Sequence, residues 1–104
     1  MSDVLAQAQK WTESGNAVAL ATVIDTRKSA PLPPGSKMAI SSTGDVVGAV
    51  SGGCVEGAVV EVAEEILGGA KPRLLHFGIA DEDAWDVGLP CGGEIDVFVE
   101  RYEP

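Results

Sequence analysis

Two cysteines, each set beside glycines, are the residues of this sequence best suited to chemistry. Cys54 ends the run Ser51-Gly52-Gly53-Cys54, and Cys91 begins the run Cys91-Gly92-Gly93. Glycines next to a thiol let the backbone approach a ligand closely and adopt positive φ. A helical pattern follows Cys54, and a helix N-terminus favours the thiolate. The two sites therefore predict reactive or ligating cysteines, and the alternative is that both are small buried apolar side chains.

Positive charge is concentrated in one stretch of an otherwise acidic chain. The formal net charge is −9, from 7 Lys and Arg against 16 Asp and Glu. Arg27, Lys28 and Lys37 flank a proline-rich loop, whereas residues 39–69 contain no cation. We expect this basic loop to receive an anion, and ordinary solvated loop charges are the competing interpretation.

The elements that must position these residues are those of an α/β domain. Helical periodicity covers residues 2–14 and 55–67, and each pattern stops at glycine. Strand patterns cover residues 17–25, 37–41, 46–50, 72–77 and 95–100, with a hairpin turn at 42–45. Strands interleaved with helices predict one domain over residues 1–104, with a mixed sheet of about four to six strands and flanking helices.

Composition excludes several classes of function. A net charge of −9 disfavours non-specific nucleic-acid binding and attraction to an anionic membrane surface. No apolar run approaches the ~20 residues of a membrane span. The N-terminus lacks the pattern of a signal peptide, so we expect a cytoplasmic protein with free, reduced cysteines instead of a disulfide scaffold.

The other titratable residues are expected to have structural roles. His76 lies in a strand-like run and is interpreted as a packed or edge-strand histidine, not a ligand. Glu61, Glu64 and Glu65 form a solvated helix face, and Glu56 is expected to stabilise the first helical turn. Two single cysteines and one histidine make a poor zinc set, and the acidic run at 81–86 lacks the spacing of a calcium loop.

Several motifs follow one another over residues 17–100. They are Ser29-Ala30-Pro31, Pro34-Gly35-Ser36-Lys37-Met38, the run from Gly48 through Ser51-Gly52-Gly53-Cys54-Val55-Glu56 to Gly57, Lys71 to Leu75, Phe77-Gly78, and Val87 to Gly93. Together they resemble the N-terminal domain of the XdhC/CoxI family, the accessory proteins of xanthine and carbon monoxide dehydrogenases. The chain looks like a stand-alone, CoxI-like short form of this family.

The resemblance implies a maturation factor for molybdenum hydroxylases. Such proteins are implicated in binding molybdenum cofactor (molybdopterin) transiently, in its sulfuration and in its delivery to the apo-enzyme. The residues then expected to bind the cofactor are Ser51, Gly52, Gly53, Cys54, Cys91, Gly92 and Gly93, with Arg27, Lys28 and Lys37 from the basic loop. Backbone N–H groups of the 51–53 turn suit a phosphate.

The two cysteines are the candidate catalytic residues and the candidate metal ligands. Molybdenum and its dithiolene are soft, so a thiolate from Cys54 or Cys91 fits as neighbour, ligand or sulfur relay, and the sequence leaves these roles open. Because both cysteines lie at junctions beside regular elements, we expect them to meet at one surface cleft.

Two departures limit what the resemblance implies. Longer family members carry a Rossmann-like domain, but its Gly-x-Gly-x-x-Gly fingerprint is absent here, so no NAD is expected. Leu32 stands where relatives often have arginine, which removes a guanidinium–phosphate contact.

The implied partners are a molybdenum hydroxylase apo-enzyme and either a Rossmann-domain family member or a cysteine desulfurase. The sequence leaves open whether the chain forms a homodimer. No nucleic acid and no membrane span are expected.

Two other functions remain as alternatives, and a cofactor chaperone is favoured over a turnover enzyme. The first is a thiol-based redox or metal-binding protein unrelated to molybdenum, although no Cys-x-x-Cys is present. The second is a non-catalytic docking module for a Rossmann-domain partner, in which the thiols are silent. Replacing the cysteines by alanine separates a docking module from a cofactor chaperone, because the docking module tolerates the change and the chaperone does not.

Overall fold

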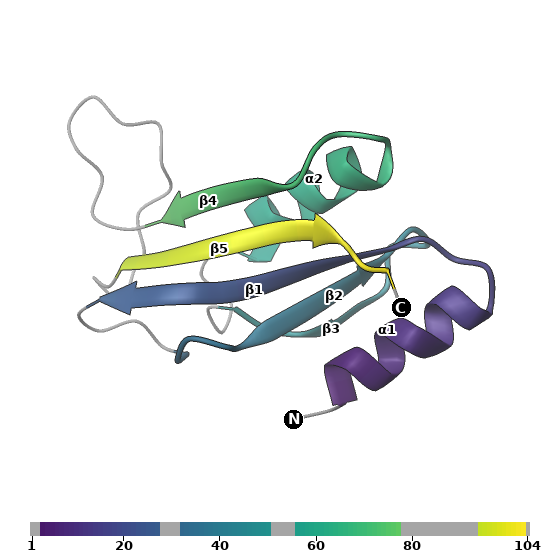
Figure 1. Cartoon of the computed structure of the whole chain (residues 1–104), viewed down its shortest axis with the longest axis horizontal. Coiled ribbons are helices and arrows are strands. Elements are labelled where there is room, and N and C mark those ends of the chain that lie inside the picture. The colour runs from purple at the N-terminus through teal and green to yellow at the C-terminus, as the bar shows by residue number, and fades with distance from the viewer. Residues whose placement is uncertain (1–2, 28–31, 51–55, 78–93, 104) are drawn as a thin grey trace.

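The computed structural model describes residues 3–27, 32–50, 56–77 and 94–103, and every structural statement below concerns these residues. Its elements are α1 (Asp3–Glu13), β1 (Val18–Arg27), β2 (Lys37–Ser41), β3 (Val46–Gly48), α2 (Glu56–Leu67), β4 (Arg73–Phe77) and β5 (Glu94–Arg101) (Figure 1). Each of them coincides with an element predicted from the sequence, with small shifts at the ends.

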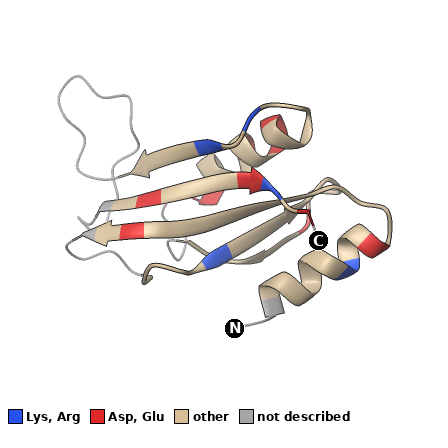
Figure 2. Ribbon diagram, viewed as in Figure 1, with Lys and Arg blue, Asp and Glu red and all other residues tan. Residues whose placement is uncertain are grey.

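Both helices end at glycine, as predicted. Gly15 and Gly69 have φ values of 90° and 113°, and the N–H groups of Asn16 and Ala70 donate to carbonyls five residues back, each at 3.0 Å. This is the Schellman arrangement, which satisfies carbonyls left open at a helix end. Glu61, Glu64 and Glu65 are exposed, which confirms the acidic solvated face of α2 (Figure 2). No described helix is long and apolar enough to cross a membrane.

The strands form one five-stranded sheet in the order β3-β2-β1-β5-β4. The α/β class, the strand number and the hairpin are confirmed, but all four pairings are antiparallel, not mixed as expected. Interleaved strands and helices usually indicate crossovers between neighbouring parallel strands. Here α2 connects β3 with β4, the two strands at opposite edges of the sheet, so this crossover creates no parallel neighbours.

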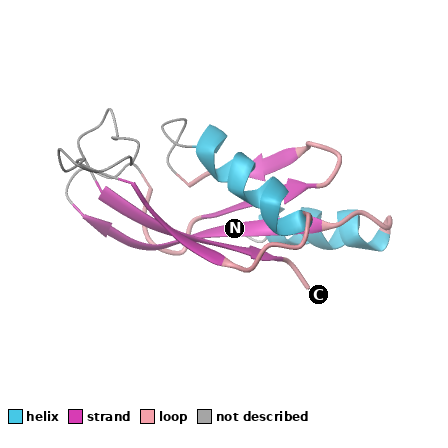
Figure 3. Cartoon of the chain, turned by 90° about the horizontal axis from the view of Figure 1, so that it is seen from above, coloured by secondary structure: helices cyan, strands magenta, loops and turns pink. Residues whose placement is uncertain are grey.

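The helices pack on opposite faces of the sheet (Figure 3). Because successive strand residues point to opposite faces, β1 contributes to two cores. The larger core, under α2, contains Ala19, Ala21, Val23, Met38, Ile40, Val59, Ala63, Ile66, Ile95, Val97 and Val99. The smaller core, under α1, contains Ala8, Val18, Leu20 and Ala39, with Trp11 packed against it. The predictions that β1 is buried on both faces and that Trp11 is a core residue are confirmed.

The two ends of the sheet differ in what they carry. At one end β1 finishes with Arg27 opposite Glu94, the first residue of β5, and Phe77 at the end of β4 pairs with Ile95. The helix α2 begins on this side, at the left in Figure 1. We call it the motif end, because residues 28–31, 51–55 and 78–93, which carry much of the motif sequence, directly adjoin these element ends in the chain. The other end, with the β2–β3 turn and the C-terminus of α2, is the turn end.

Candidate functional site

Of the predicted site residues, the structure describes Lys37 and the backbone of Arg27. The others lie outside the described residues: Lys28, Ser51, Gly52, Gly53, Cys54, Cys91, Gly92 and Gly93. The predictions that the cysteines are reactive, ligate a metal and share one cleft therefore stay predictions. The structure does describe residues that adjoin these segments in the sequence, and it shows the contacts that fix their positions.

Val50 and Glu56, which precede and follow the Cys54 segment in the sequence, are joined by a hydrogen bond. The backbone N–H of Val50 donates to Oε2 of Glu56 at 2.9 Å. Val50 is fully buried and belongs to the larger core. A hydrogen bond to a carboxylate is stronger than one between neutral groups, and an acid in the first turn also interacts favourably with the helix dipole. Glu56 thus fastens the start of α2 to the core, which supports its predicted structural role.

Gly48, where β3 ends, lies at a close approach that only glycine allows. Its φ is +82°, and an added Cβ would lie 2.3 Å from the carbonyl oxygen of Lys37 and 2.7 Å from Cγ2 of Val4. Sequence reasoning assigned the chemistry to Gly52 and Gly53 and missed this position. A glycine within a strand often marks a close approach of another backbone. The position of Gly48 within the predicted strand 46–50 was therefore the sequence signal that could have identified it.

A groove lies between the first turns of α1 and the proline segment that leads into β2. Its volume is about 940 Å³, and its apolar walls include Leu5, Leu32, Pro33, Pro34 and Ala49. We call it the proline groove. Leu32 contributes to this wall, so the wall is apolar at this position. A groove of this size, mostly apolar with few polar groups, is typical of small-molecule sites.

Lys37 provides the described positive charge of the proline groove. Its Nζ donates to Oγ1 of Thr22 on β1 at 3.2 Å, and the residue is half-buried. An ammonium group has three donors, so two remain for other acceptors. The basic loop therefore supplies a fixed ammonium group to the groove.

A row of titratable side chains crosses three strands near the motif end. In the register of the sheet, Asp25 lies opposite Asp96, and Asp96 lies opposite His76. Nδ1 of His76 is 2.6 Å from Oδ1 of Asp96, and the two side chains are 41% and 19% exposed. His76 stands on the edge strand β4, as predicted. Within the described ranges, no group of three His, Cys, Asp or Glu could hold a metal ion.

Asp25 and Asp96 were not singled out by the sequence reasoning. Asp96 alternates with Ile95 and Val97 along β5, which indicates only that it faces away from the larger core. The pairing with His76 depends on β4 and β5 being neighbours, and no local pattern reveals that. A carboxylate that accepts from Nδ1 orients the imidazole ring of the histidine.

The family model and the similar proteins all point to the same family. The model of the XdhC and CoxI family matches residues 11–78. The molybdenum cofactor insertion chaperone PaoD of Escherichia coli is 36% identical over 89 residues, which are 85% of this chain and 27% of PaoD. A probable xanthine dehydrogenase subunit of Bacillus subtilis is 32% identical over 84 residues, which are 79% of this chain and 26% of that protein.

A solved structure has the same fold. The crystal structure of a xanthine dehydrogenase from Bacillus halodurans superimposes with a TM-score of 0.77 at 28% identity, covering 99% of this chain and 31% of that chain. The chain therefore spans only about a quarter to a third of the length of these proteins. The resemblance inferred from the motifs is confirmed, and the chain belongs to the XdhC and CoxI family.

Proposed function

We propose that this chain is an accessory factor in the maturation of a xanthine dehydrogenase-type molybdenum hydroxylase, and that it binds molybdenum cofactor transiently at its motif end. The observation that carries the proposal is the 36% identity, over 85% of the chain, with a molybdenum cofactor insertion chaperone. The proposed partners are the apo-enzyme and a further family chain, a cysteine desulfurase or a second copy of this chain. The proposed setting is the cytoplasm.

The proline groove suits the chemistry of this cargo. Molybdopterin has a flat heterocyclic ring system and a terminal phosphate. Apolar walls such as Pro33 and Pro34 can cover the ring faces, and the ammonium of Lys37 can meet the phosphate as a point charge. The turn predicted from the sequence at Ser51, Gly52 and Gly53, which lie outside the described residues, is the proposed second phosphate contact.

In this proposal, the cysteines provide the soft ligands. A thiolate from Cys54 or Cys91 is matched to molybdenum and its sulfur atoms, both as a ligand and as a carrier of sulfur. The bond between Val50 and Glu56 supports the proposal indirectly, because it fixes the residues adjoining the Cys54 segment. Both cysteines are then required for cofactor transfer, whereas a docking module would not need them.

The test is direct binding of the cofactor. Cofactor released from a denatured molybdenum hydroxylase under anaerobic conditions is passed with the purified protein through a gel-filtration column. The protein fractions are then oxidised and their pterin fluorescence is measured. We expect pterin to elute with the wild-type chain and to fall sharply with Cys54→Ala and Cys91→Ala, both remaining folded by circular dichroism.

Three outcomes would contradict the proposal. If no pterin elutes with the wild-type chain, cofactor binding is wrong. If both alanine variants bind as the wild type does and also restore hydroxylase activity in a deletion strain, the docking module becomes the better explanation. A deletion strain without redundant relatives that retains fully sulfurated, active hydroxylases would exclude the maturation role altogether.

A further inference from the structure

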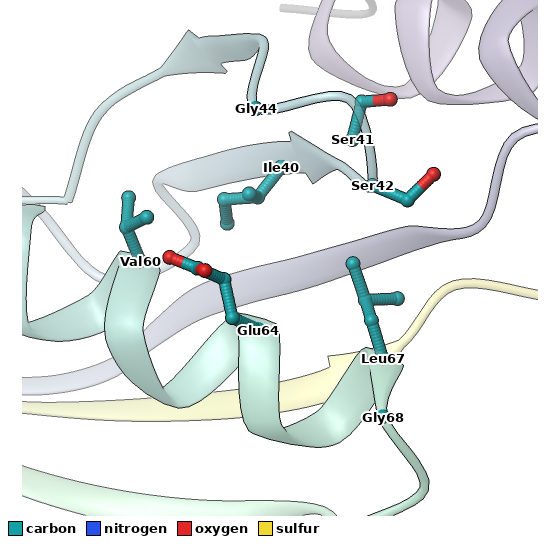
Figure 4. A pocket seen from close by; sticks show the side chains of 8 residues that line it. All are labelled: Ile40, Ser41, Ser42, Gly44, Val60, Glu64, Leu67 and Gly68. Atoms are coloured by element: carbon teal, nitrogen blue, oxygen red, sulfur yellow. The ribbon is translucent and has the colours of Figure 1, made fainter.

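A second cavity lies at the turn end, between the C-terminal half of α2 and the β2–β3 turn (Figure 4). Its volume is about 360 Å³. Ile40 of β2 and Val60 and Leu67 of α2 form apolar walls, and Ser42 and Gly68 belong to its rim. This volume is within the range of small-ligand sites, and the cavity shares no residue with the proline groove.

Glu64 is the charged residue of this cavity. In Figure 4 its carboxylate points toward Val60 and Ile40, and the residue is exposed. The adjacent Glu65 is neutralised by Arg73, with Nη2 at 3.2 Å from Oε1. Among the described residues, Glu64 makes no such ion pair. The cavity therefore holds a carboxylate whose charge the described residues leave uncompensated.

The position of Glu64 on its helix adds to this negative potential. Glu64 precedes Leu67, the last residue of α2, by less than one turn, and the last turn carries no basic residue. The C-terminus of a helix has a partial negative charge, so cations are favourable there and carboxylates unfavourable. The net charge of the chain is −9 as well. Together these charges make the cavity suited to a cation and unsuited to an anionic cofactor.

We propose that this cavity binds a guanidinium group carried on a short aliphatic chain. A guanidinium is planar, donates two parallel hydrogen bonds to one carboxylate and is less strongly hydrated than an ammonium. Its aliphatic stem packs on Val60 and Leu67 while its charge meets Glu64. An arginine side chain of a partner protein and a free alkylguanidine share this chemistry. The inference is independent of the proposed function, because it concerns the other end of the sheet.

The test is a titration followed by the amide chemical shifts of the full chain. The probe is n-butylguanidinium, and its neutral isostere n-butylurea is the reference. We expect saturable shifts at residues 60–68 and 40–44 with n-butylguanidinium. The affinity for n-butylurea should be lower by at least about tenfold. Because the interaction is electrostatic and partly exposed, added salt should weaken it.

Matched variants assign the effect to Glu64. Glu64→Gln should lower the affinity for n-butylguanidinium about five- to tenfold. Glu61→Gln removes the same charge from the same helix outside the cavity, and should leave the affinity within about twofold. Glu64→Lys supplies a cation of its own and should abolish binding. Since Glu64 has an unfavourable place on the helix, both of its variants should fold, which circular dichroism checks.

A further probe distinguishes an arginine side chain of a partner protein from a free alkylguanidine as the natural ligand. The blocked peptide acetyl-Gly-Arg-Gly-amide should bind at least as tightly as n-butylguanidinium if the cavity receives an arginine side chain. It should bind more weakly if the cavity takes a free alkylguanidine. The proposal is overturned by the absence of saturable shifts below about 50 mM probe, by equal binding of n-butylurea, or by equal affinities of the Gln variants at 61 and 64.

Discussion

The two ends of the sheet place the same residue type in opposite electrostatic contexts. At the motif end, Glu56 begins α2 and accepts the N–H of Val50 at 2.9 Å. At the turn end, Glu64 lies near the C-terminus of the same helix without an ion pair among the described residues. One glutamate stabilises the helix and the other opposes its dipole. The same helix therefore holds one glutamate that serves the fold and one solvated glutamate for which we propose a ligand.

The charges around the two cavities follow the same division. The proline groove has the ammonium of Lys37 beside apolar walls, and the turn-end cavity has the carboxylate of Glu64 beside apolar walls. The dipole of α2 points its positive end toward the motif end. In the two proposals, an anionic cargo and a cationic group have separate places on one small fold, and the following substitutions test that separation.

The largest expected effect is at Gly48. Replacing Gly48 by alanine should lower the free energy of unfolding by about 3 kcal/mol or more, because positive φ and overpacking add. Gly44 is the control: it lies in the same hairpin at the turn end, with φ +95° and nothing within 4 Å of an added Cβ. Gly44→Ala should cost only about 1–2 kcal/mol. Urea denaturation measures both, and equal losses would contradict the close approach at Gly48.

The two glutamates of α2 should respond to neutralisation with opposite signs. Glu56→Gln should lower the free energy of unfolding by about 1 kcal/mol, since it loses a charge-assisted hydrogen bond and a favourable dipole interaction. Glu64→Gln should leave stability unchanged or raise it by about 0.3–0.5 kcal/mol. Thermal and urea unfolding at low salt provide the comparison. A destabilised Glu64→Gln protein would show that Glu64 has a structural role after all.

Lys37 tests whether the positive charge of the proline groove attracts the cargo. Lys37→Gln should lower the affinity for molybdenum cofactor about fivefold and flatten its dependence on salt. Lys71→Gln is the control, since Lys71 is exposed and follows α2 near the turn end. The pterin assay at two salt concentrations gives both quantities. Equal losses in the two variants would point to a general effect of net charge instead of a contact in the groove.

The smallest effect is expected where a charge is already compensated at the surface. Arg73 and Glu65 form an ion pair with side chains that are 41% and 57% exposed. Arg73→Gln should change the free energy of unfolding by less than about 0.5 kcal/mol, because such pairs are screened by solvent. Binding of n-butylguanidinium should also stay within about twofold of wild type. A clear gain or loss of that binding would mean that Glu65 contributes to the cavity.

Much of the fold could be predicted because its signals are local. The alternation of Ile95, Val97 and Val99 identified β5, and the glycines at 15 and 69 identified both helix ends. The motifs identified the family. Of the predicted site residues, Lys37 lines a groove, and the cysteines lie outside the described residues, so the site itself stays a prediction. The roles of Gly48, Glu64 and the His76–Asp96 pair could not be read from their neighbours in sequence.

The elements, their ends and the family follow from the sequence alone, because hydrophobic period, turn chemistry and motif order are properties of nearby residues. Which strands are neighbours follows only from the packing of the whole chain. Because α2 connects the two edge strands, it creates no parallel neighbours, and every described pairing is antiparallel. The same packing brings Val4 against Gly48 and closes a cavity between Ile40 and Leu67. Such contacts join residues distant in the chain, and their geometry depends on how the whole sheet and both helices pack.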